Sequence, residues 1–183
     1  MNLSLLPNTL TLTRIILTFP IVFLLLKQSF LLAFILFLIA GITDGLDGFI
    51  AKKFKYQTQL GSILDPLADK LLLVSSFLAL FIVGLIPWWL LITIAIRDII
   101  IIAGTVGFYY ADGLKQKRLL TPSNLSKLNT VLQISLVALL MISQVFLPLK
   151  DMLDVGYIIV GTSTVLSGID YTWLWIKTIL LEK

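Results

Sequence analysis

Four aspartates in the first half of the chain have the spacing to hold metal ions and to do acid–base chemistry. Asp44 and Asp47 are three residues apart, and Asp65 and Asp69 are four residues apart. On a helix, either spacing places both side chains on one face. The pairs flank a connecting stretch of roughly ten residues between two apolar segments. An antiparallel helical hairpin would bring all four carboxylates to one depth.

The chemistry open to this cluster is limited by what the chain lacks. There is no histidine and no cysteine, so acid–base or metal chemistry has to use carboxylates. Four carboxylates in a poorly solvated place repel each other unless cations neutralise them. Nearby lysines are one source of positive charge. A pair of hard divalent ions, such as Mg²⁺, Mn²⁺ or Ca²⁺, suits oxygen ligands better and also suits phosphoryl transfer.

The elements that position these residues are apolar segments of membrane-spanning length. Of 183 residues, 58% are apolar and only 13% are charged, whereas soluble proteins carry about 25% charged residues. Most of the surface should therefore face lipid. We predict an all-α, polytopic membrane protein with six transmembrane helices near residues 9–27, 30–51, 63–83, 87–110, 125–147 and 154–177.

The positions of the basic residues predict the orientation. Two alternate loops contain Lys52, Lys53, Lys55, Lys115, Lys117 and Arg118, whereas the opposite loops contain only Lys27 and Lys150. Basic loops stay in the cytoplasm, so both termini and the aspartates should lie at the cytoplasmic face of a bacterial inner membrane or an equivalent membrane. The net charge of +4 then reflects topology and attraction to anionic lipid headgroups. No extramembrane module is visible that could bind nucleic acid.

The aspartates belong to a longer pattern that resembles a known family. Asp44-Gly-Leu-Asp47-Gly48-Phe-Ile-Ala51-Lys52, followed by Gly61-Ser-Ile-Leu-Asp65-Pro-Leu-Ala-Asp69, resembles the signature of the CDP-alcohol phosphatidyltransferases. Seven of its eight defining positions match; Lys52 stands where the family usually has arginine, which keeps the charge and loses the planar fork. The resemblance covers nearly the whole chain and implies one transmembrane domain, residues 1–183.

The resemblance implies a role for each matching residue. Two ions, Mg²⁺ or Mn²⁺, would be held by Asp44, Asp47, Asp65 and Asp69. Asp65 and Asp69 are the expected catalytic residues, with Asp69 as the general base. The CDP moiety of CDP-diacylglycerol would contact Asn8, Thr11, Asp47, Gly48, Ala51, Lys52 and Gly61. Helix capping is an equally good explanation of Asn8 and Thr11. The family also suggests a homodimer.

The acceptor alcohol separates two branches of the family. Phosphatidylglycerophosphate synthases use glycerol 3-phosphate and typically have Arg-Glu and a further arginine, where this chain has Arg97-Asp98 and Thr105. They also typically have Gly-Lys-x-Lys-Thr, where this chain has Ser126-Lys127-Leu-Asn129-Thr130. Thr105 and Asn129 each stand where that branch has a cation, and a phosphomonoester is bound best by clustered cations. We therefore expect Arg97, Lys127 and Asn129 to bind phosphatidylglycerol, as in CMP-forming cardiolipin synthases. Glycerol 3-phosphate is the alternative acceptor.

Two other interpretations concern polar residues within the membrane. Arg97 and Asp98 could simply form a local ion pair, and intramembrane carboxylates also occur in ion-coupled transporters. Transporter sites usually lie at the bilayer midplane in paired repeats, whereas these aspartates lie near one interface and no repeat is visible. We expect interfacial anchoring from Trp88, Trp89, Trp173 and Trp175.

Overall fold

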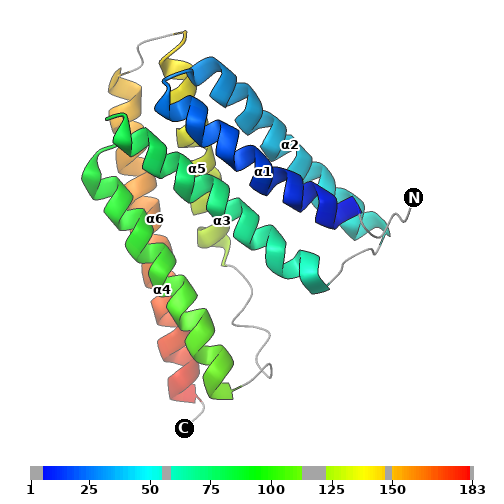
Figure 1. Cartoon of the computed structure of the whole chain (residues 1–183). Helices are drawn as coiled ribbons and strands as arrows, with labels where there is room; N and C mark the ends of the chain where they lie inside the picture. The colour runs from blue at the N-terminus through cyan, green and yellow to red at the C-terminus, as the bar shows by residue number, and fades with distance from the viewer. Residues whose placement is uncertain (1–5, 55–58, 113–122, 147–149, 182–183) are drawn as a thin grey trace. The chain divides into compact units, whose positions relative to one another are not determined.

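The computed structural model is helical in the part of the chain that it describes, which is residues 6–54, 59–112, 123–146 and 150–181. Side chains are described for residues 11–43, 67–104, 123–146 and 152–177. The helices, labelled in Figure 1, are α1 (Leu6–Leu26), α2 (Phe30–Phe54), α3 (Gln59–Ile82), α4 (Trp88–Asp112), α5 (Asn124–Ser143) and α6 (Lys150–Leu181). Each predicted segment therefore corresponds to one helix.

Two helix ends have a clear backbone cause. α1 ends where Gln28 takes a left-handed conformation with φ of 58°, and α3 ends at Gly84 with φ of 79°. In both turns the next residue donates back across the turn: Ser29 N to Leu24 O at 2.9 Å, and Leu85 N to Leu80 O at 2.9 Å. This pattern satisfies the last helix carbonyls and reverses the chain.

The α2–α3 connection differs from the prediction. α2 continues to Phe54 and α3 already begins at Gln59, so four residues separate them instead of roughly ten. Lys52 and Lys53 lie inside the helix, because lysine is a good helix former and apolar content does not define where a helix ends. Asp47 is consequently seven residues before the end of α2, and Asp65 is six residues after the start of α3.

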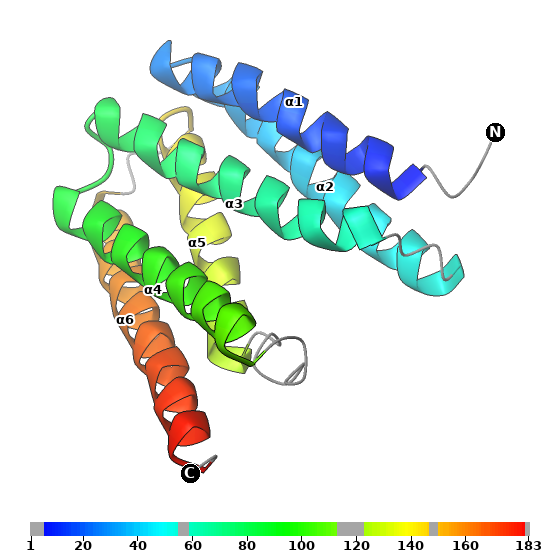
Figure 2. The same ribbon diagram turned by 60° about the horizontal axis from the view of Figure 1, so that its bottom comes forward.

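The chain divides into two compact units, and the first contains α1, α2, α3 and the last turns of α5 from Val137. Both α2 and α3 pack on α1, and the three helices lie side by side in Figures 1 and 2. The buried face of α1 repeats every three or four residues, as expected for a packed helix. It consists of Thr11, Arg14, Thr18, Ile21 and Leu25.

The second unit contains α4, α5 up to Leu136, and α6. α4 packs along α6 through two tryptophan–glycine contacts. A Cβ added to Gly161 of α6 would lie 2.7 Å from the Trp89 ring, and one added to Gly104 of α4 would overlap the Trp175 ring. The absent side chains let the two helices approach closely. Trp89 and Trp175 thus have a packing role in addition to the predicted interfacial one.

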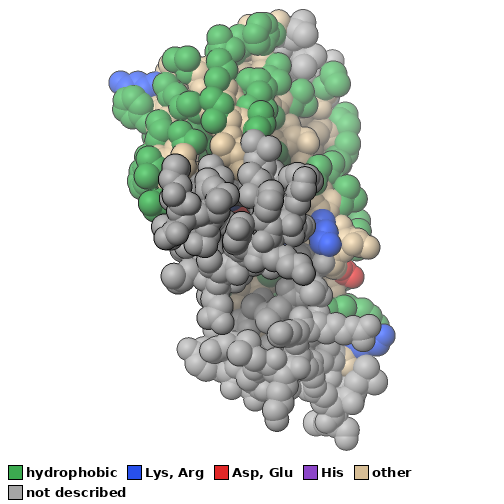
Figure 3. Space-filling view, turned by 90° about the vertical axis from the view of Figure 1, so that its right-hand side faces the viewer, with side chains coloured by type: hydrophobic (Ala, Val, Ile, Leu, Met, Phe, Trp, Pro, Cys, Tyr) green, Lys and Arg blue, Asp and Glu red, His purple; other side chains and the backbone are tan. Residues whose placement is uncertain are grey.

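The described surface is strongly apolar. Two helical stretches are long and apolar enough to cross a membrane, Asn124–Ser143 with 20 residues and Met152–Lys177 with 26 residues, and Thr11–Leu26 and Phe30–Thr43 are shorter apolar stretches. Side chains such as Phe19 and Ile99 are largely exposed. On the face in Figure 3, the described side chains are mostly hydrophobic and few are charged. Such a surface suits contact with lipid.

Candidate functional site

The four predicted aspartates lie on two helices of the first unit. Asp44 and Asp47 lie on α2, and Asp65 and Asp69 lie on α3, so each pair has the spacing for one helix face. Both helices pack on α1 in the same unit. The side chains of Asn8, Asp44, Asp47, Gly48, Ala51, Lys52, Gly61 and Asp65 lie outside the described residues. Their metal and CDP contacts therefore remain predictions; the described side chains include no cluster of three acidic groups.

Asp69 is the one member of the predicted metal set whose side chain is described. Its carboxylate oxygen Oδ1 accepts a hydrogen bond from Nη1 of Arg14, and the two side chains form an ion pair. Arg14 lies on α1, 55 residues earlier in the chain. The guanidinium side chain is 1% exposed and the carboxylate side chain is 49% exposed. The pair therefore joins a buried cation to a carboxylate that a ligand can still reach.

Sequence reasoning did not assign a role to Arg14. Its signal in the sequence is a charge inside an apolar segment, and an intramembrane charge usually marks a functional or paired position. The neighbouring hydroxyls strengthen that signal. Thr11 is fully buried on the same face of α1, and Thr18 Oγ1 donates to the carbonyl oxygen of Arg14 at 2.9 Å. The predicted contact between Thr11 and CDP remains a prediction.

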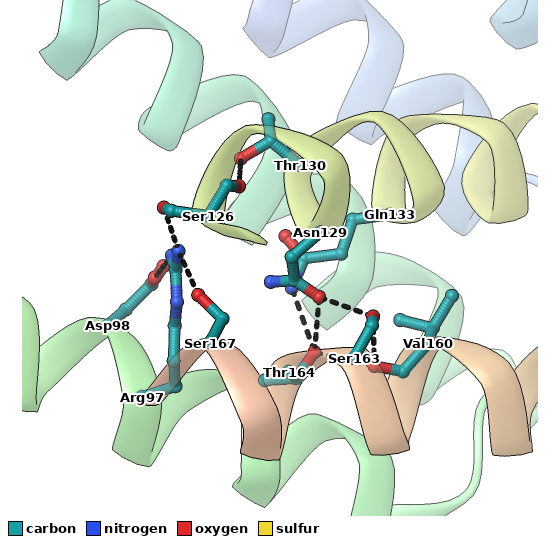
Figure 4. Close-up of polar contacts among 10 residues, drawn as sticks. All are labelled: Arg97, Asp98, Ser126, Asn129, Thr130, Gln133, Val160, Ser163, Thr164 and Ser167. Atoms are coloured by element: carbon teal, nitrogen blue, oxygen red, sulfur yellow. Dashed lines mark hydrogen bonds and ion pairs between the residues drawn. The ribbon is translucent and has the colours of Figure 1, made fainter. Parts of the chain in front are cut away.

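A second polar cluster surrounds Arg97 in the other unit. Arg97 lies on α4 and is 6% exposed. Its Nη1 donates to Asp98 Oδ1 at 2.8 Å, and its Nη2 donates to Ser126 Oγ of α5 and, at 3.0 Å, to Ser167 Oγ of α6. Figure 4 shows these contacts. The expected local ion pair with Asp98 is therefore present, and it lies inside a network that joins three helices.

Asn129 lies on α5 within the same unit and is fully buried. Its Oδ1 accepts hydrogen bonds from Ser163 Oγ at 2.7 Å and from Thr164 Oγ1 at 2.9 Å. Gln133 Nε2, one turn along α5, donates to Thr164 Oγ1 at 3.4 Å. Arg97 and Asn129 are thus both hydrogen-bonded to α6, and their contact with an acceptor remains a prediction.

Lys127 has a different environment. Its side chain is exposed on α5, and it lies two residues before Asn129, on a different face of the helix. The hydrogen bonds described here connect the cluster to Ser126 and Asn129 instead. Its assignment to the acceptor site remains a prediction. The start of α5 is defined by Ser123, whose Oγ accepts from the Ser126 backbone N–H at 3.2 Å and caps the helix.

These features define a class: a helical protein with an apolar exterior, a carboxylate pair on each of two neighbouring helices, and buried arginines. The chain belongs to the CDP-alcohol phosphatidyltransferase family, because the model of that family matches residues 4–180.

Two kinds of relative are similar to the chain. The cardiolipin synthase (CMP-forming) of Homo sapiens is 38% identical over 154 residues, which cover 76% of this chain and 51% of the human protein. The probable cardiolipin synthase (CMP-forming) of Drosophila melanogaster is 36% identical over 151 residues, 75% of this chain and 47% of the fly protein. The probable phosphatidylglycerophosphate synthase of Mycobacterium tuberculosis H37Rv is 30% identical over 177 residues, 91% of this chain and 79% of that protein. The chain thus spans about half the length of the two cardiolipin synthases.

Proposed function

We propose that this chain transfers the phosphatidyl group of CDP-diacylglycerol to phosphatidylglycerol, which forms cardiolipin and releases CMP. Family membership and the aspartate spacing support the transfer reaction. The acceptor rests on one observation: the buried guanidinium of Arg97 is already paired with Asp98. A site with so little surplus positive charge suits a phosphodiester, which has one negative charge, better than a phosphomonoester.

The residues of this chain would act on the acceptor and the donor in one displacement. Asp69 accepts the proton of the acceptor hydroxyl, whose oxygen then forms a bond to the phosphorus that carries diacylglycerol. The bond from this phosphorus to the bridging oxygen breaks, and CMP leaves with both electrons. Arg14 holds Asp69 in place for proton transfer, because the guanidinium is buried between helices and contacts Oδ1.

The side chain of Asp69 fits a role beside divalent ions. It is an oxygen ligand, it is 49% exposed, and its helix carries Asp65 one turn earlier. Asp44, Asp47, Asp65 and Asp69 would hold two ions, Mg²⁺ or Mn²⁺. Bound ions would neutralise the phosphate oxygens during phosphoryl transfer. Asn8, Thr11, Asp47, Gly48, Ala51, Lys52 and Gly61 would contact CDP.

The same proposal includes the membrane arrangement. All six helices would cross the bilayer, with both termini and the aspartates on the cytoplasmic side, because the basic residues lie in the loops of that side. A homodimer is proposed from the family resemblance alone. Cysteines introduced singly at Gln28 and at Gln116 should react with a membrane-impermeant reagent from opposite sides. Labelling of both from one side would contradict this topology.

The acceptor is tested with purified protein, CDP-diacylglycerol, Mg²⁺ or Mn²⁺, and each alcohol in turn. Phosphatidylglycerol should yield cardiolipin and CMP in equal amounts, identified by mass spectrometry. Asp44→Asn and Asp65→Asn should abolish CMP release, whereas Asp154→Asn, at an exposed position of α6, should not.

Glycerol 3-phosphate is a second candidate acceptor because the mycobacterial relative that is named a probable phosphatidylglycerophosphate synthase aligns with 91% of this chain. Formation of phosphatidylglycerophosphate without cardiolipin would contradict the charge argument. The additional cations would then have to come from Lys115, Lys117 or Arg118.

A further inference from the structure

Hydroxyl side chains of α6 contact both buried residues that the sequence assigned to the acceptor. Ser167 Oγ accepts from Arg97 Nη2 at 3.0 Å, and Ser163 and Thr164 donate to Asn129 Oδ1 at 2.7 Å and 2.9 Å. Thr164 and Ser167 are fully buried. In Figure 4 the three hydroxyls follow one another along α6 and point toward α5 and the side chain of Arg97. This helix carried no predicted site residue, so its part in the cluster comes from the tertiary structure.

The hydrogen bonds from α6 set the direction of the Asn129 amide. A side-chain amide has an oxygen that accepts and a nitrogen that donates, and each half can meet only a complementary group. Ser163 and Thr164 each have one hydroxyl hydrogen, which they can donate to Asn129 Oδ1 or to the carbonyl of Val160. While they hold Oδ1, the nitrogen Nδ2 has to face the other way.

Two buried donors of the cluster need a partner. Within the part of the chain that the structure describes, Asn129 Nδ2 and Arg97 Nε donate to no acceptor and are shielded from solvent. Buried N–H groups in proteins are nearly always satisfied, so two such groups in one cluster need an explanation. In Figure 4, Asn129 Nδ2 lies on the side of the amide that faces Arg97. Both groups donate, so both suit the oxygen atoms of a bound headgroup.

We propose that Ser163 and Thr164 are positioning residues, which turn Asn129 so that Nδ2 donates to the glycerol phosphodiester headgroup of the acceptor lipid. Ser167 orients Arg97 in the same way, so that Arg97 Nε donates a hydrogen bond to a phosphodiester oxygen. This inference rests on the proposed function, and it adds α6 as the helix that selects the acceptor. The charge of the cluster also favours a phosphodiester. Arg97 and Asp98 together carry no net charge, so they do not compensate the second negative charge of a phosphomonoester.

The test compares the double variant Ser163→Ala/Thr164→Val with Thr162→Val. Thr162 is an exposed neighbour that bonds only to backbone carbonyls of its own helix among the contacts described, which makes it a matched control. Loss of the oriented donor should raise the KM for phosphatidylglycerol by about tenfold, with the KM for CDP-diacylglycerol and the kcat changed less than about threefold. Thr162→Val should leave all three values unchanged. Equal changes in both KM values would overturn the inference.

A binding measurement separates this inference from the proposed reaction. Short-chain radiolabelled phosphatidylglycerol is titrated onto detergent-solubilised protein, with short-chain phosphatidylcholine as the background. The double variant should bind phosphatidylglycerol about tenfold more weakly than wild type, even if the wild type makes no cardiolipin. Unchanged binding in the double variant overturns the inference whatever the enzyme makes.

Asn129→Asp provides a second variant in case the double variant does not fold. A carboxylate has the shape of the amide but cannot donate, so phosphatidylglycerol binding should fall at least as far as in the double variant. Circular dichroism and thermal unfolding in detergent confirm that each variant is folded. Binding by Asn129→Asp at the wild-type level would show that oxygen, not nitrogen, faces the ligand, and the inference would be wrong.

Discussion

The ion pair between Arg14 and Asp69 leads to a prediction about stability that needs no assumption about catalysis. The two partners are unequally buried: the arginine side chain is 1% exposed and the aspartate side chain is 49% exposed. Removing the partner of a buried charge is costly, because that charge stays away from water. Removing the partner of a half-exposed charge costs less, because the remaining group can be solvated.

Three variants test whether this unequal burial determines the cost of breaking the ion pair. Asp69→Ala removes this carboxylate while the guanidinium stays charged and buried. It should cost about 3 kcal/mol of unfolding free energy, the lower end of the range for a broken buried pair, because Arg14 keeps its other contacts. Arg14→Met removes the buried charge and keeps a side chain of similar length, so its cost should be smaller, about 1–3 kcal/mol for the lost charged hydrogen bond. The double variant Arg14→Met/Asp69→Ala leaves neither charge. It should recover about 2 kcal/mol or more relative to Asp69→Ala alone, since apolar replacements of buried ion pairs are often neutral.

The assay is reversible unfolding in mixed micelles with increasing dodecyl sulfate, followed by the fluorescence of the four tryptophans. A difference of 2 kcal/mol between Asp69→Ala and the double variant is more than about tenfold in the equilibrium constant, which a denaturant midpoint resolves. The reasoning is refuted if the double variant is no more stable than Asp69→Ala, or if Arg14→Met is the least stable of the three. Either result would show that the buried guanidinium does not depend on Asp69.

Three further predictions concern the donor site and the α4–α6 contact. Excess chelator should abolish CMP release and Mg²⁺ or Mn²⁺ should restore it, because clustered carboxylates otherwise repel an anionic donor; full turnover in chelator would exclude a divalent-ion mechanism. Lys52→Ala should raise the KM for CDP-diacylglycerol about tenfold, whereas Lys52→Arg should be tolerated and Lys55→Ala should have little effect. Equal effects of both alanine variants would show that Lys52 only helps to set the membrane orientation. Gly104→Val should lower the free energy of unfolding by about 1–3 kcal/mol, because a side chain there overlaps Trp175. An unchanged unfolding midpoint would contradict that contact.

Much of the helical layout could be predicted from composition. The apolar segment predicted at 30–51 corresponds to α2, Phe30–Phe54, and the one at 87–110 corresponds to α4, Trp88–Asp112. The largest errors are at helix ends: α6 runs from Lys150 to Leu181 and not from 154 to 177, and α5 ends at Ser143 and not at 147. Hydropathy identifies the part of a helix that suits lipid, but backbone hydrogen bonding continues as long as the residues tolerate a helix.

The candidate site was predictable only where its signal is local. The spacing of Asp44, Asp47, Asp65 and Asp69 is a property of two short stretches, so the sequence shows it directly. The Arg97–Asp98 pair was likewise expected as an alternative, because the residues are adjacent, and the structure contains that pair.

The sequence by itself determined a helical chain with an apolar exterior, the carboxylate motif and the family to which the chain belongs. Only the tertiary structure decided which helix faces meet. It brought Arg14 to Asp69 across 55 residues, and it brought Asn129 to Thr164 across 35 residues. Serine and threonine are common in lipid-facing and packed helices alike, so nothing in the local pattern separates Thr164, which holds Asn129, from the exposed Thr162. That difference depends on the rotation of α6 against α5, and packing of the whole helix sets this rotation.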